Sequence, residues 1–184
     1  MSVYWVGISL VGIALAMFGS ADVQVAPKTT TEKGFTVVGI SARTSNAKEA
    51  SGEGIIGKQW DRFMKESLLG KISNKVDSNI VVVYSDYESD ANGAYDYTIG
   101  ARVNSATKIP AGMVAKKVPP GRYAMFTSQK GFVGKVVPEA WSRIWSMSKS
   151  VMGGDRAYQA DFEIYDQRAV DQENAQVDIY VGIK

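Results

Sequence analysis

The sequence contains neither cysteine nor histidine among its 184 residues. Their absence excludes thiol nucleophiles, Ser-His-Asp triads, imidazole metal ligands and zinc fingers. Any acid–base chemistry must therefore use Asp, Glu, Tyr or Lys. We expect no metal site and no cofactor. Because the chain has no cysteine to oxidise or to pair, its redox compartment is left open.

Clusters of one charge sign are also missing. The 21 Lys and Arg residues and the 19 Asp and Glu residues are interleaved, and the longest basic run is the pair Lys116-Lys117. Nucleic-acid-binding surfaces usually concentrate Lys and Arg, so we expect no nucleic-acid partner. The hydrophobic fraction of 45% fits an ordinary globular protein, either one domain or two small halves packed together.

One uncharged stretch stands at the N-terminus. Residues 3–21 carry no charged side chain, and Gly19-Ser20-Ala21 forms a small-residue cleavage site. We predict that residues 1–21 are a signal peptide or a membrane anchor, although no Lys or Arg precedes them; a soluble core helix is the third alternative. The first two alternatives imply an exported protein, periplasmic or extracellular, or one associated with a membrane through residues 3–21. We predict that residues 22–33 form a polar linker and that the folded domain begins at Gly34.

The remainder of the chain alternates between strand-like and helix-like patterns. A polar linker, residues 104–111, separates two series of elements in the same order, strand, helix, strand, strand. The first series is predicted at residues 35–40, 55–69, 79–87 and 94–103, with Trp60 on the apolar face of the helix. The second is predicted at residues 113–126, 136–147, a strand around Glu163, and 176–183.

The two series also match residue by residue. Trp60, Arg62 and Phe63 precede Trp141, Arg143 and Ile144 by 81 positions, and Asp96, Ile99 and Gly100 precede Asp178, Val181 and Gly182 by 82. Such a repeat indicates a duplicated supersecondary unit. We therefore predict an α+β fold with repeat halves of about 34–103 and 112–184 related by pseudo-two-fold symmetry. Antiparallel sheets would carry two helices and a central ligand cleft.

A glycine motif in the first half resembles a nucleotide-binding fingerprint. Gly52-Glu53-Gly54-Ile55-Ile56-Gly57 has the spacing of the dinucleotide pattern. That fingerprint requires a tight turn directly after a buried strand, whereas about ten polar residues intervene here. We therefore predict no dinucleotide site.

The segment Asp161-Phe162-Glu163-Ile164-Tyr165-Asp166 carries the main functional candidates. In an extended chain Phe162 and Ile164 face one side, and Glu163 and Tyr165 face the other. An ordinary half-exposed strand with Glu163 in water would show the same pattern. The duplication places Val82 at the position equivalent to Glu163, so only one half carries the acid.

The repeat also predicts which side chains share a surface with this acid. If Tyr97 and Ile99 are core, then Ile179 and Val181 are core. We place Phe162 with that core, which leaves a mostly aromatic surface with one carboxylate. Its predicted members are Val82, Tyr84, Glu163, Tyr165 and Tyr180.

Four other aromatic residues are candidates for the same cleft. Trp141 and Trp145 lie one helical turn apart, a spacing that favours packing in the core over lining a pocket. Tyr123 and Phe126 follow the turn Pro119-Pro120-Gly121 near the expected cleft, and the pattern leaves core and pocket open for both.

At this level the sequence resembles the GyrI-like small-molecule-binding family, the effector-binding domain of AraC-type and multidrug-responsive regulators. The resemblance covers about Phe35–Lys184 and rests on Phe-Thr-Val-Val-Gly-Ile-Ser at the start of the domain, Val-Pro-Pro-Gly-Arg-Tyr-Ala-Met-Phe, Asp-Phe-Glu-Ile-Tyr, and the closing Val-Asp-Ile-Tyr-Val-Gly-Ile. It implies a pocket between the halves in which aromatic rings stack on amphipathic, often cationic ligands. A buried acid compensates their charge, and by position that acid is Glu163.

Three functions follow as hypotheses. The first is binding of amphipathic cationic or aromatic small molecules by a stand-alone module, monomer or homodimer, because no helix-turn-helix precedes the domain in this sequence. The second is hydrolysis of strained electrophiles, with Glu163 as base and Tyr165 as proton donor. The third is a protein-interaction role such as gyrase inhibition, which family names imply but no residue here singles out.

Overall fold

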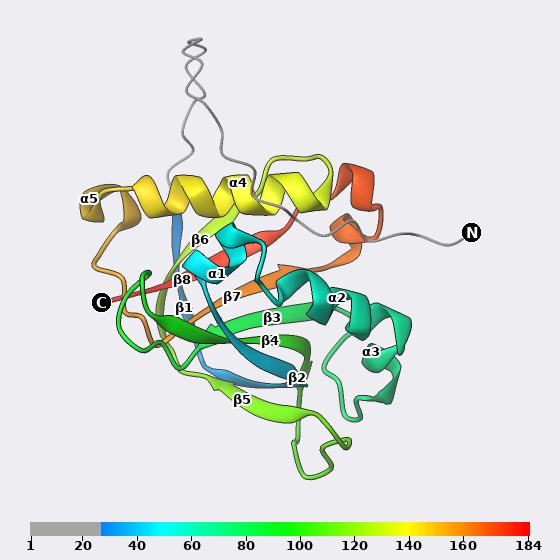
Figure 1. Cartoon of the computed structure of the whole chain (residues 1–184). Helices are drawn as coiled ribbons and strands as arrows, with labels where there is room; N and C mark the ends of the chain where they lie inside the picture. Colours follow the sequence, from blue (N-terminus) through cyan, green and yellow to red (C-terminus); the bar gives the residue numbers. More distant parts are fainter. Residues whose placement is uncertain (1–26) are drawn as a thin grey trace.

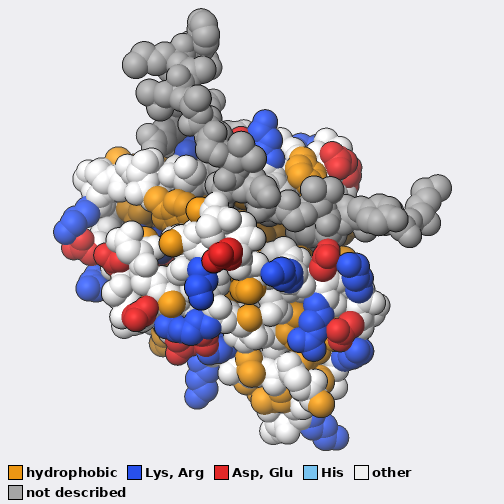
Figure 2. All heavy atoms as spheres, in the orientation of Figure 1, with side chains coloured by type: hydrophobic (Ala, Val, Ile, Leu, Met, Phe, Trp, Pro, Cys, Tyr) orange, Lys and Arg blue, Asp and Glu red, His pale blue; other side chains and the backbone are white. Residues whose placement is uncertain are grey.

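The computed structural model describes residues 27–184, so the predicted leader lies outside the described residues. The described chain forms one eight-stranded antiparallel sheet with helices packed on one of its faces (Figure 1). No helix between residues 27 and 184 is long and apolar enough to cross a bilayer. Acidic and basic side chains are interspersed on the face seen in Figure 2, as the interleaved sequence suggests.

The elements follow the predicted order in both halves. The strands are β1 (Lys28–Glu32), β2 (Phe35–Ser45), β3 (Ile80–Ser85), β4 (Ala94–Val103), β5 (Val114–Val118), β6 (Gly121–Thr127), β7 (Ala160–Tyr165) and β8 (Asp178–Ile183). The helices are α1 (Asn46–Ser51), α2 (Ile56–Lys65), α3 (Leu68–Lys71), α4 (Val133–Ser146) and α5 (Lys149–Met152), with short 3-10 turns at Gln167–Ala169 and Gln172–Asn174.

The strand order confirms the predicted duplication. The sheet reads β1-β6-β8-β7-β3-β4-β2-β5, so the unit β6-α4-β7-β8 mirrors the unit β2-α2-β3-β4 across the β7–β3 boundary. The two halves join in one continuous sheet because β3 and β7 pair directly, with Val82 opposite Glu163. The α+β class and the pseudo-two-fold arrangement are therefore as predicted.

Part of the predicted linker is a strand. Residues 28–32 form β1, which pairs with β6 along its whole length, so the folded domain begins before Gly34. Three of these five residues are Thr, whose branched Cβ favours extended backbone. Gly34 has φ +80°, and a Cβ there would crowd Pro120, so glycine suits the turn between β1 and β2.

The sheet curls strongly. The strands β5 and β6 occupy the eighth and second positions, which in a flat sheet would lie about 29 Å apart. Only Pro119 and Pro120 connect them, a link that spans about 10 Å. Gly39 and Gly100 face each other where β2 and β4 cross, and a Cβ on either would collide with the backbone of the other strand.

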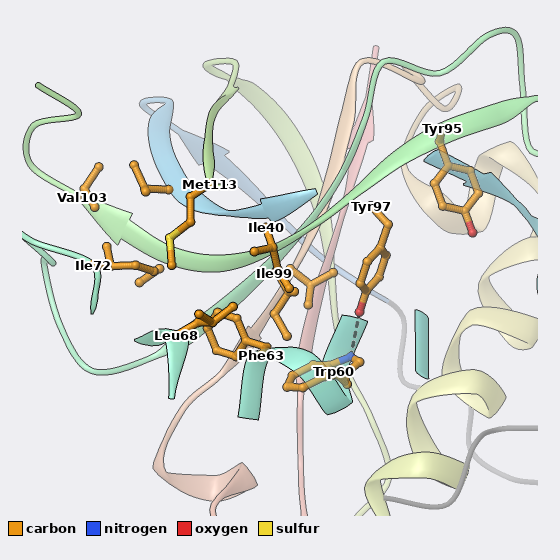
Figure 3. Packing of buried hydrophobic residues seen from close by; sticks show 13 residues of the cluster. Ile40, Trp60, Phe63, Leu68, Ile72, Tyr95, Tyr97, Ile99, Val103 and Met113 are labelled. Atoms are coloured by element: carbon orange, nitrogen blue, oxygen red, sulfur yellow. Dashed lines mark hydrogen bonds between the residues drawn. The ribbon is translucent and has the colours of Figure 1, made fainter. Parts of the chain in front are cut away.

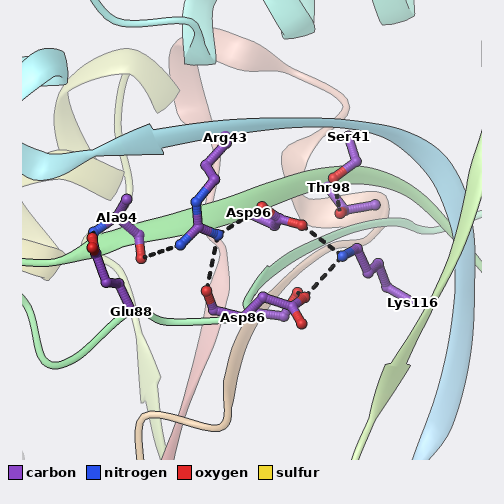
Figure 4. A network of polar contacts seen from close by, with 9 residues as sticks. Ser41, Arg43, Asp86, Glu88, Ala94, Asp96, Thr98 and Lys116 are labelled. Carbon is purple, nitrogen blue, oxygen red and sulfur yellow. Dashed lines mark hydrogen bonds and ion pairs between the residues drawn. The ribbon is translucent and has the colours of Figure 1, made fainter.

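The curl gives the sheet two apolar faces. The face without helices encloses its own cluster of side chains, made of Val37, Val81, Val83, Val118, Tyr123, Ala160 and Phe162. At one end of this face an ion-pair network joins β2, β4 and β5 (Figure 4). Lys116 binds Asp86 at 2.8 Å and Asp96 at 2.7 Å, and Arg43 binds Asp96 at 3.0 Å.

The helices cover the other face and divide its core in two. In the first half α2 and α3 bury Trp60, Phe63 and Leu68 against the sheet (Figure 3). In the second half α4 buries Trp141 and Ile144 against β8. Each large apolar side chain withdrawn from water contributes roughly 1.5–3 kcal/mol, so these two clusters hold the helices in place on either side of the central strands.

Candidate functional site

A cavity of about 360 Å³ lies on the helix-covered face, between α2 and α4 and above the central strands β3, β4 and β7. Both repeat halves line it, and α1 contributes to its rim. Its wall includes eight aromatic side chains: Trp60, Tyr84, Tyr87, Tyr95, Tyr97, Trp141, Trp145 and Tyr165. The predicted central cleft is therefore present, on the helix side of the sheet.

Glu163 lies in the floor of this cavity and is almost fully buried, with 1% of its surface exposed. Its Oε1 accepts hydrogen bonds from Tyr84 Oη at 2.8 Å and from Trp141 Nε1 at 2.5 Å. Its Oε2 accepts one from Tyr165 Oη at 2.8 Å. All three donors are neutral, and no Lys or Arg within residues 27–184 forms an ion pair with Glu163.

Burial raises the pKa of Glu163 above its ordinary value, because the charged carboxylate loses its hydration. The hydrogen bonds from Trp141, Tyr165 and Tyr84 act in the opposite direction, since they favour the charged form. The same burial, reinforced by the nearby carboxylate, raises the pKa of Tyr84 and Tyr165, so both phenols stay neutral and donate. The site is thus a carboxylate held by neutral donors in an apolar wall.

The repeat explains how the acid is held. Tyr84 and Tyr165 are equivalent positions of the two halves, and they bind one carboxylate from opposite repeats. The Tyr84 ring also packs on Trp141 at 5.1 Å and on Tyr97 at 5.3 Å between ring centroids. Trp60 packs on Tyr165 at 4.8 Å. These edge-to-face contacts fix the rings whose hydroxyl groups hold Glu163.

A second buried acid lies next to the cavity wall. Asp161 is fully buried on β7 and accepts hydrogen bonds from Tyr87 Oη at 2.7 Å and from the Gly182 backbone N–H at 2.8 Å. Unlike Glu163 it has a protein cation, because it forms an ion pair with Arg156. The Arg156 guanidinium lies 4.4 Å from the Tyr158 ring centroid and also lines the cavity.

Several lining residues were not anticipated from the sequence. Trp60 was assigned to the core alone, although it is the repeat equivalent of Trp141 and both line the cavity. Glu49 falls in a segment that the sequence indicated to be a polar loop, but this segment forms helix α1. The Glu49 carboxylate accepts hydrogen bonds from the N–H groups of Ile55 and Ile56 at the start of α2. Arg156 gave no sequence signal. The cavity therefore contains two acids and one base, rather than one carboxylate.

Trp141 and Trp145 both reach the cavity. The sequence pattern favoured core packing for each, and Trp141 does both, because it is buried in the α4 cluster while its indole N–H faces Glu163. Trp145 is 48% exposed and lines the cavity at its open side. Core packing and cavity lining are therefore not exclusive alternatives for residues on α4, because this helix borders both the core and the cavity.

Four predicted ligand-binding residues do not line the cavity, among the residues that the structure describes. Val82 lies on the correct face but is completely buried beneath it. Tyr180 stacks on Phe162 at 4.4 Å on the opposite face of the sheet, and Tyr123 packs there too. Phe126 packs against the α4 cluster. The prediction that these four share one cavity surface with Glu163 is therefore not met by the structure.

The misplacement of Tyr180 has a clear physical source. Phe162 pairs with Tyr180, and Glu163 pairs with Ile179, so Glu163 shares its face with Ile179 and Phe162 lies on the other. The prediction had placed Phe162 with Ile179. Both faces of this curled sheet are apolar, so alternation alone cannot tell which strand faces coincide.

Comparisons with known proteins place this geometry in a family. The chain is 37% identical over 147 residues to the putative transcriptional regulator protein YobU of Bacillus subtilis (strain 168), covering 79% of this chain and 90% of YobU. An integron cassette protein from the mobile metagenome of Vibrio cholerae has 26% identity and a TM-score of 0.69, over 87% of this chain and 97% of that one.

A further solved structure, SAV2435 bound to tetraphenylphosphonium, has a TM-score of 0.70 at 19% identity, over 86% of this chain and 93% of that one, and so shares the fold. The resemblance to effector-binding domains that the sequence motifs suggested is confirmed at the level of the fold family. Residues 29–183 match the Cass2 family model, and the chain therefore belongs to the family of integron-associated effector binding proteins.

Proposed function

We propose that this protein binds amphipathic aromatic cations in the cavity between α2 and α4, with Glu163 as their counter-charge. One observation carries the proposal: Glu163 is a buried carboxylate that has three neutral donors and no cationic partner among residues 27–184. A buried charge is normally paired. A cationic ligand supplies the partner that the described chain does not provide.

The wall of the cavity suits such a ligand. A cation over an aromatic face gains roughly 0.5–2 kcal/mol per contact, and eight aromatic side chains line this cavity. Its volume of about 360 Å³ lies within the range of small-molecule sites. Apolar walls also lower the local dielectric, which strengthens the attraction between a carboxylate and an incoming cation.

The probe follows from a protein of the same fold. SAV2435 has been solved with tetraphenylphosphonium, a cation whose charge is surrounded by four aromatic rings. That ligand has a close structural analogue of opposite charge, tetraphenylborate. The pair separates the effect of charge from the effects of shape and hydrophobicity, which the two ions share.

We expect isothermal titration calorimetry to show binding of tetraphenylphosphonium and much weaker binding of tetraphenylborate. Glu163→Gln keeps the size and an acceptor oxygen but removes the charge, so it should weaken the cation by about 10–100-fold. It should leave tetraphenylborate unchanged or improve it. Glu139→Gln, an exposed position on α4, is the matched control and should change neither ion. Equal cation affinity in wild type and Glu163→Gln would contradict the proposal.

The geometry favours binding over hydrolysis by the same residues. A hydrolase would need Tyr165 to direct its proton toward a leaving group, whereas its hydroxyl donates to Glu163 Oε2. Tyr84 and Trp141 also donate their hydrogen bonds to this carboxylate. Three donors that stabilise the charged form make Glu163 a weaker base than a buried carboxylate without them.

A further inference from the structure

Arg156 is a charged residue of the cavity wall that the proposed function does not use. It lies between α5 and β7, where its backbone forms a bridge with Ile183. Its side chain is 11% exposed and lines the same cavity as Glu163. Both residues contact Trp141: Glu163 accepts its indole N–H, and the Arg156 guanidinium lies 6.0 Å from its ring centroid. They form no ion pair with each other within the described chain.

The guanidinium is held firmly but has donors to spare. One terminal nitrogen of Arg156 donates to Asp161, and Tyr158 packs on the plane of the group. The Nε–H is buried and has no hydrogen-bond acceptor among residues 27–184. An arginine carries five N–H donors in a rigid fork, so most of this fork is free to meet an acceptor. Because the Nε–H has almost no exposed surface, the donors that a ligand in the cavity can reach are the remaining N–H groups on the terminal nitrogens.

Arg156 also stands where two hollows meet. A second cavity, of about 270 Å³, lies at the C-terminal end of α4 beside α5, and its lining includes Met147, Met152 and Lys149. Ala91, Trp145 and Arg156 line both cavities, so they form the boundary between them. A ligand arm that reaches Arg156 from the Glu163 end of the first cavity therefore points toward the second.

The charges indicate which acceptor fits. Asp161 is fully buried and already neutralises Arg156, so the pair presents N–H donors without a net positive charge. Glu163 and Glu49 add negative charge to the cavity wall. A full carboxylate on the ligand would be repelled by these acids, whereas a neutral carbonyl oxygen accepts a hydrogen bond without that cost.

We propose that Arg156 is a second ligand-recognition residue, which holds the carbonyl oxygen of a cationic ligand whose acceptor-bearing arm points toward the second cavity. This inference rests on the proposed function, because the cationic end of the ligand is taken to lie against Glu163. The ligand class thereby narrows from aromatic cations in general to aromatic cations with a neutral ester, amide or ketone arm.

Three benzyltriphenylphosphonium ions test the wild-type protein by calorimetry. They carry a para-methoxycarbonyl group, a para-isobutyl group of the same size, or a para-carboxylate. The ester should bind about 5–10-fold more tightly than the alkyl analogue, the expected gain from one hydrogen bond to a charged donor, and the carboxylate more weakly than the ester. Equal binding of ester and alkyl ions would overturn the assignment, and a tighter carboxylate would contradict the neutral acceptor.

Arg156→Lys preserves the charge opposite Asp161 but removes Nε–H and the fork. We expect it to reduce the ratio of ester to alkyl affinity to less than twofold, whatever the change in the affinity of the alkyl ion. The double variant Arg156→Gln with Asp161→Asn removes both charges together, should behave in the same way, and keeps the test valid if the lysine variant folds poorly. Arg143→Lys, on the exposed side of α4, is the control.

A purely structural role for Arg156 gives a different result. In that case Arg156→Lys would lower the melting temperature and leave the ratio of ester to alkyl affinity at its wild-type value, which would overturn the inference. Failure of the proposed function is recognised separately, because none of the three phosphonium ions would then bind the wild-type protein. Binding of the alkyl ion without an ester advantage contradicts only the role of Arg156.

Discussion

In the first half of the molecule Trp60 donates its indole N–H to Tyr97 Oη at 2.8 Å, whereas in the second half Trp141 donates to Glu163 at 2.5 Å (Figure 3 shows the first of these bonds). The two tryptophans are equivalent positions on α2 and α4. In the second half Ile179 stands at the position equivalent to Tyr97, and in the first half Val82 stands at the position equivalent to Glu163 and pairs with it. The acceptor of the tryptophan N–H is therefore a neutral phenol in the first half and a carboxylate in the second.

This difference shows how a duplicated frame acquires one polar centre. The equivalent residues Tyr84 and Tyr165, one from each half, each donate a hydrogen bond to one oxygen of Glu163. The tryptophans are also matched, whereas their acceptors differ: Tyr97 in the first half and Glu163 in the second. A second carboxylate at position 82 would lie next to the first in the β3–β7 pair, and two like charges in a buried site strongly disfavour ionisation. A single acid is thus the arrangement in which the carboxylate can stay charged.

The largest effect is expected when Glu163 is replaced by valine, the residue at the equivalent position 82 of the first half. Glu163→Val leaves the donors of Trp141, Tyr84 and Tyr165 without an acceptor, whereas Glu163→Gln retains one. We expect both variants to lose the preference for tetraphenylphosphonium over tetraphenylborate. The valine variant should also be less stable than the glutamine variant by about 1–3 kcal/mol, measured by urea unfolding. Equal stabilities would show that the three donors do not depend on this acceptor.

The two tryptophans should differ in what their loss affects. Trp141→Phe removes a donor that holds Glu163 as well as part of the wall, so we expect tetraphenylphosphonium to weaken about 3–10-fold more than tetraphenylborate. Trp60→Phe removes a wall of the cavity without touching the acid, and should weaken both ions by a similar factor. Titration calorimetry with both ions measures the two ratios. Identical charge selectivity in the two variants would contradict the asymmetry.

The pH dependence is expected to be the mildest effect. Burial raises the folded-state pKa of Glu163 above its ordinary value of 4.5, so the acid takes up a proton as the pH falls through that raised pKa. Cation affinity should therefore decline as the pH falls through that raised pKa, by at most tenfold per pH unit. Tetraphenylphosphonium does not titrate, and Glu163→Gln, which shows the pH response of the remaining groups, should have a flatter profile.

The free energy of unfolding of the ligand-free protein should also depend on pH through Glu163. A raised pKa means that the folded state favours the protonated acid, so the contribution of Glu163 to stability is full below pH 4.5 and is lost as the pH rises through the folded pKa. Glu163→Gln should consequently gain stability relative to wild type as the pH rises across this window. Denaturant unfolding at several pH values measures the difference, and a gain in the opposite direction would contradict the raised pKa.

Much of the fold could be predicted because it rests on local patterns. The apolar spacing around Trp60 and Trp141 places one stripe on each helix, and the matched offsets reveal the duplication before any contact is known. The helix predicted over residues 55–69 is divided at Ser67, whose φ of 50° ends one helix before the next begins. The strand at 28–32 was missed because its stability comes from pairing with β6, which its own residues do not show.

The candidate site was less predictable because its residues come from many elements. Glu163, Tyr84 and Tyr165 were found through the repeat, which is information internal to the sequence. Tyr180 was wrongly included, because its face depends on the pairing of β7 with β8. Arg156 lies in a loop, and its place beside the cavity follows from its ion pair with a buried aspartate on β7.

The sequence by itself determined the order of elements, the duplication and the presence of one acid among equivalent aromatic positions, because periodicity and repetition are properties of the chain alone. The tertiary structure decided which face of each strand lines the cavity, because both faces of the curled sheet are apolar and only the strand register distinguishes them. It also decided that Asp161 has an arginine partner while Glu163 has only neutral donors. That contrast depends on which side chains folding brings together.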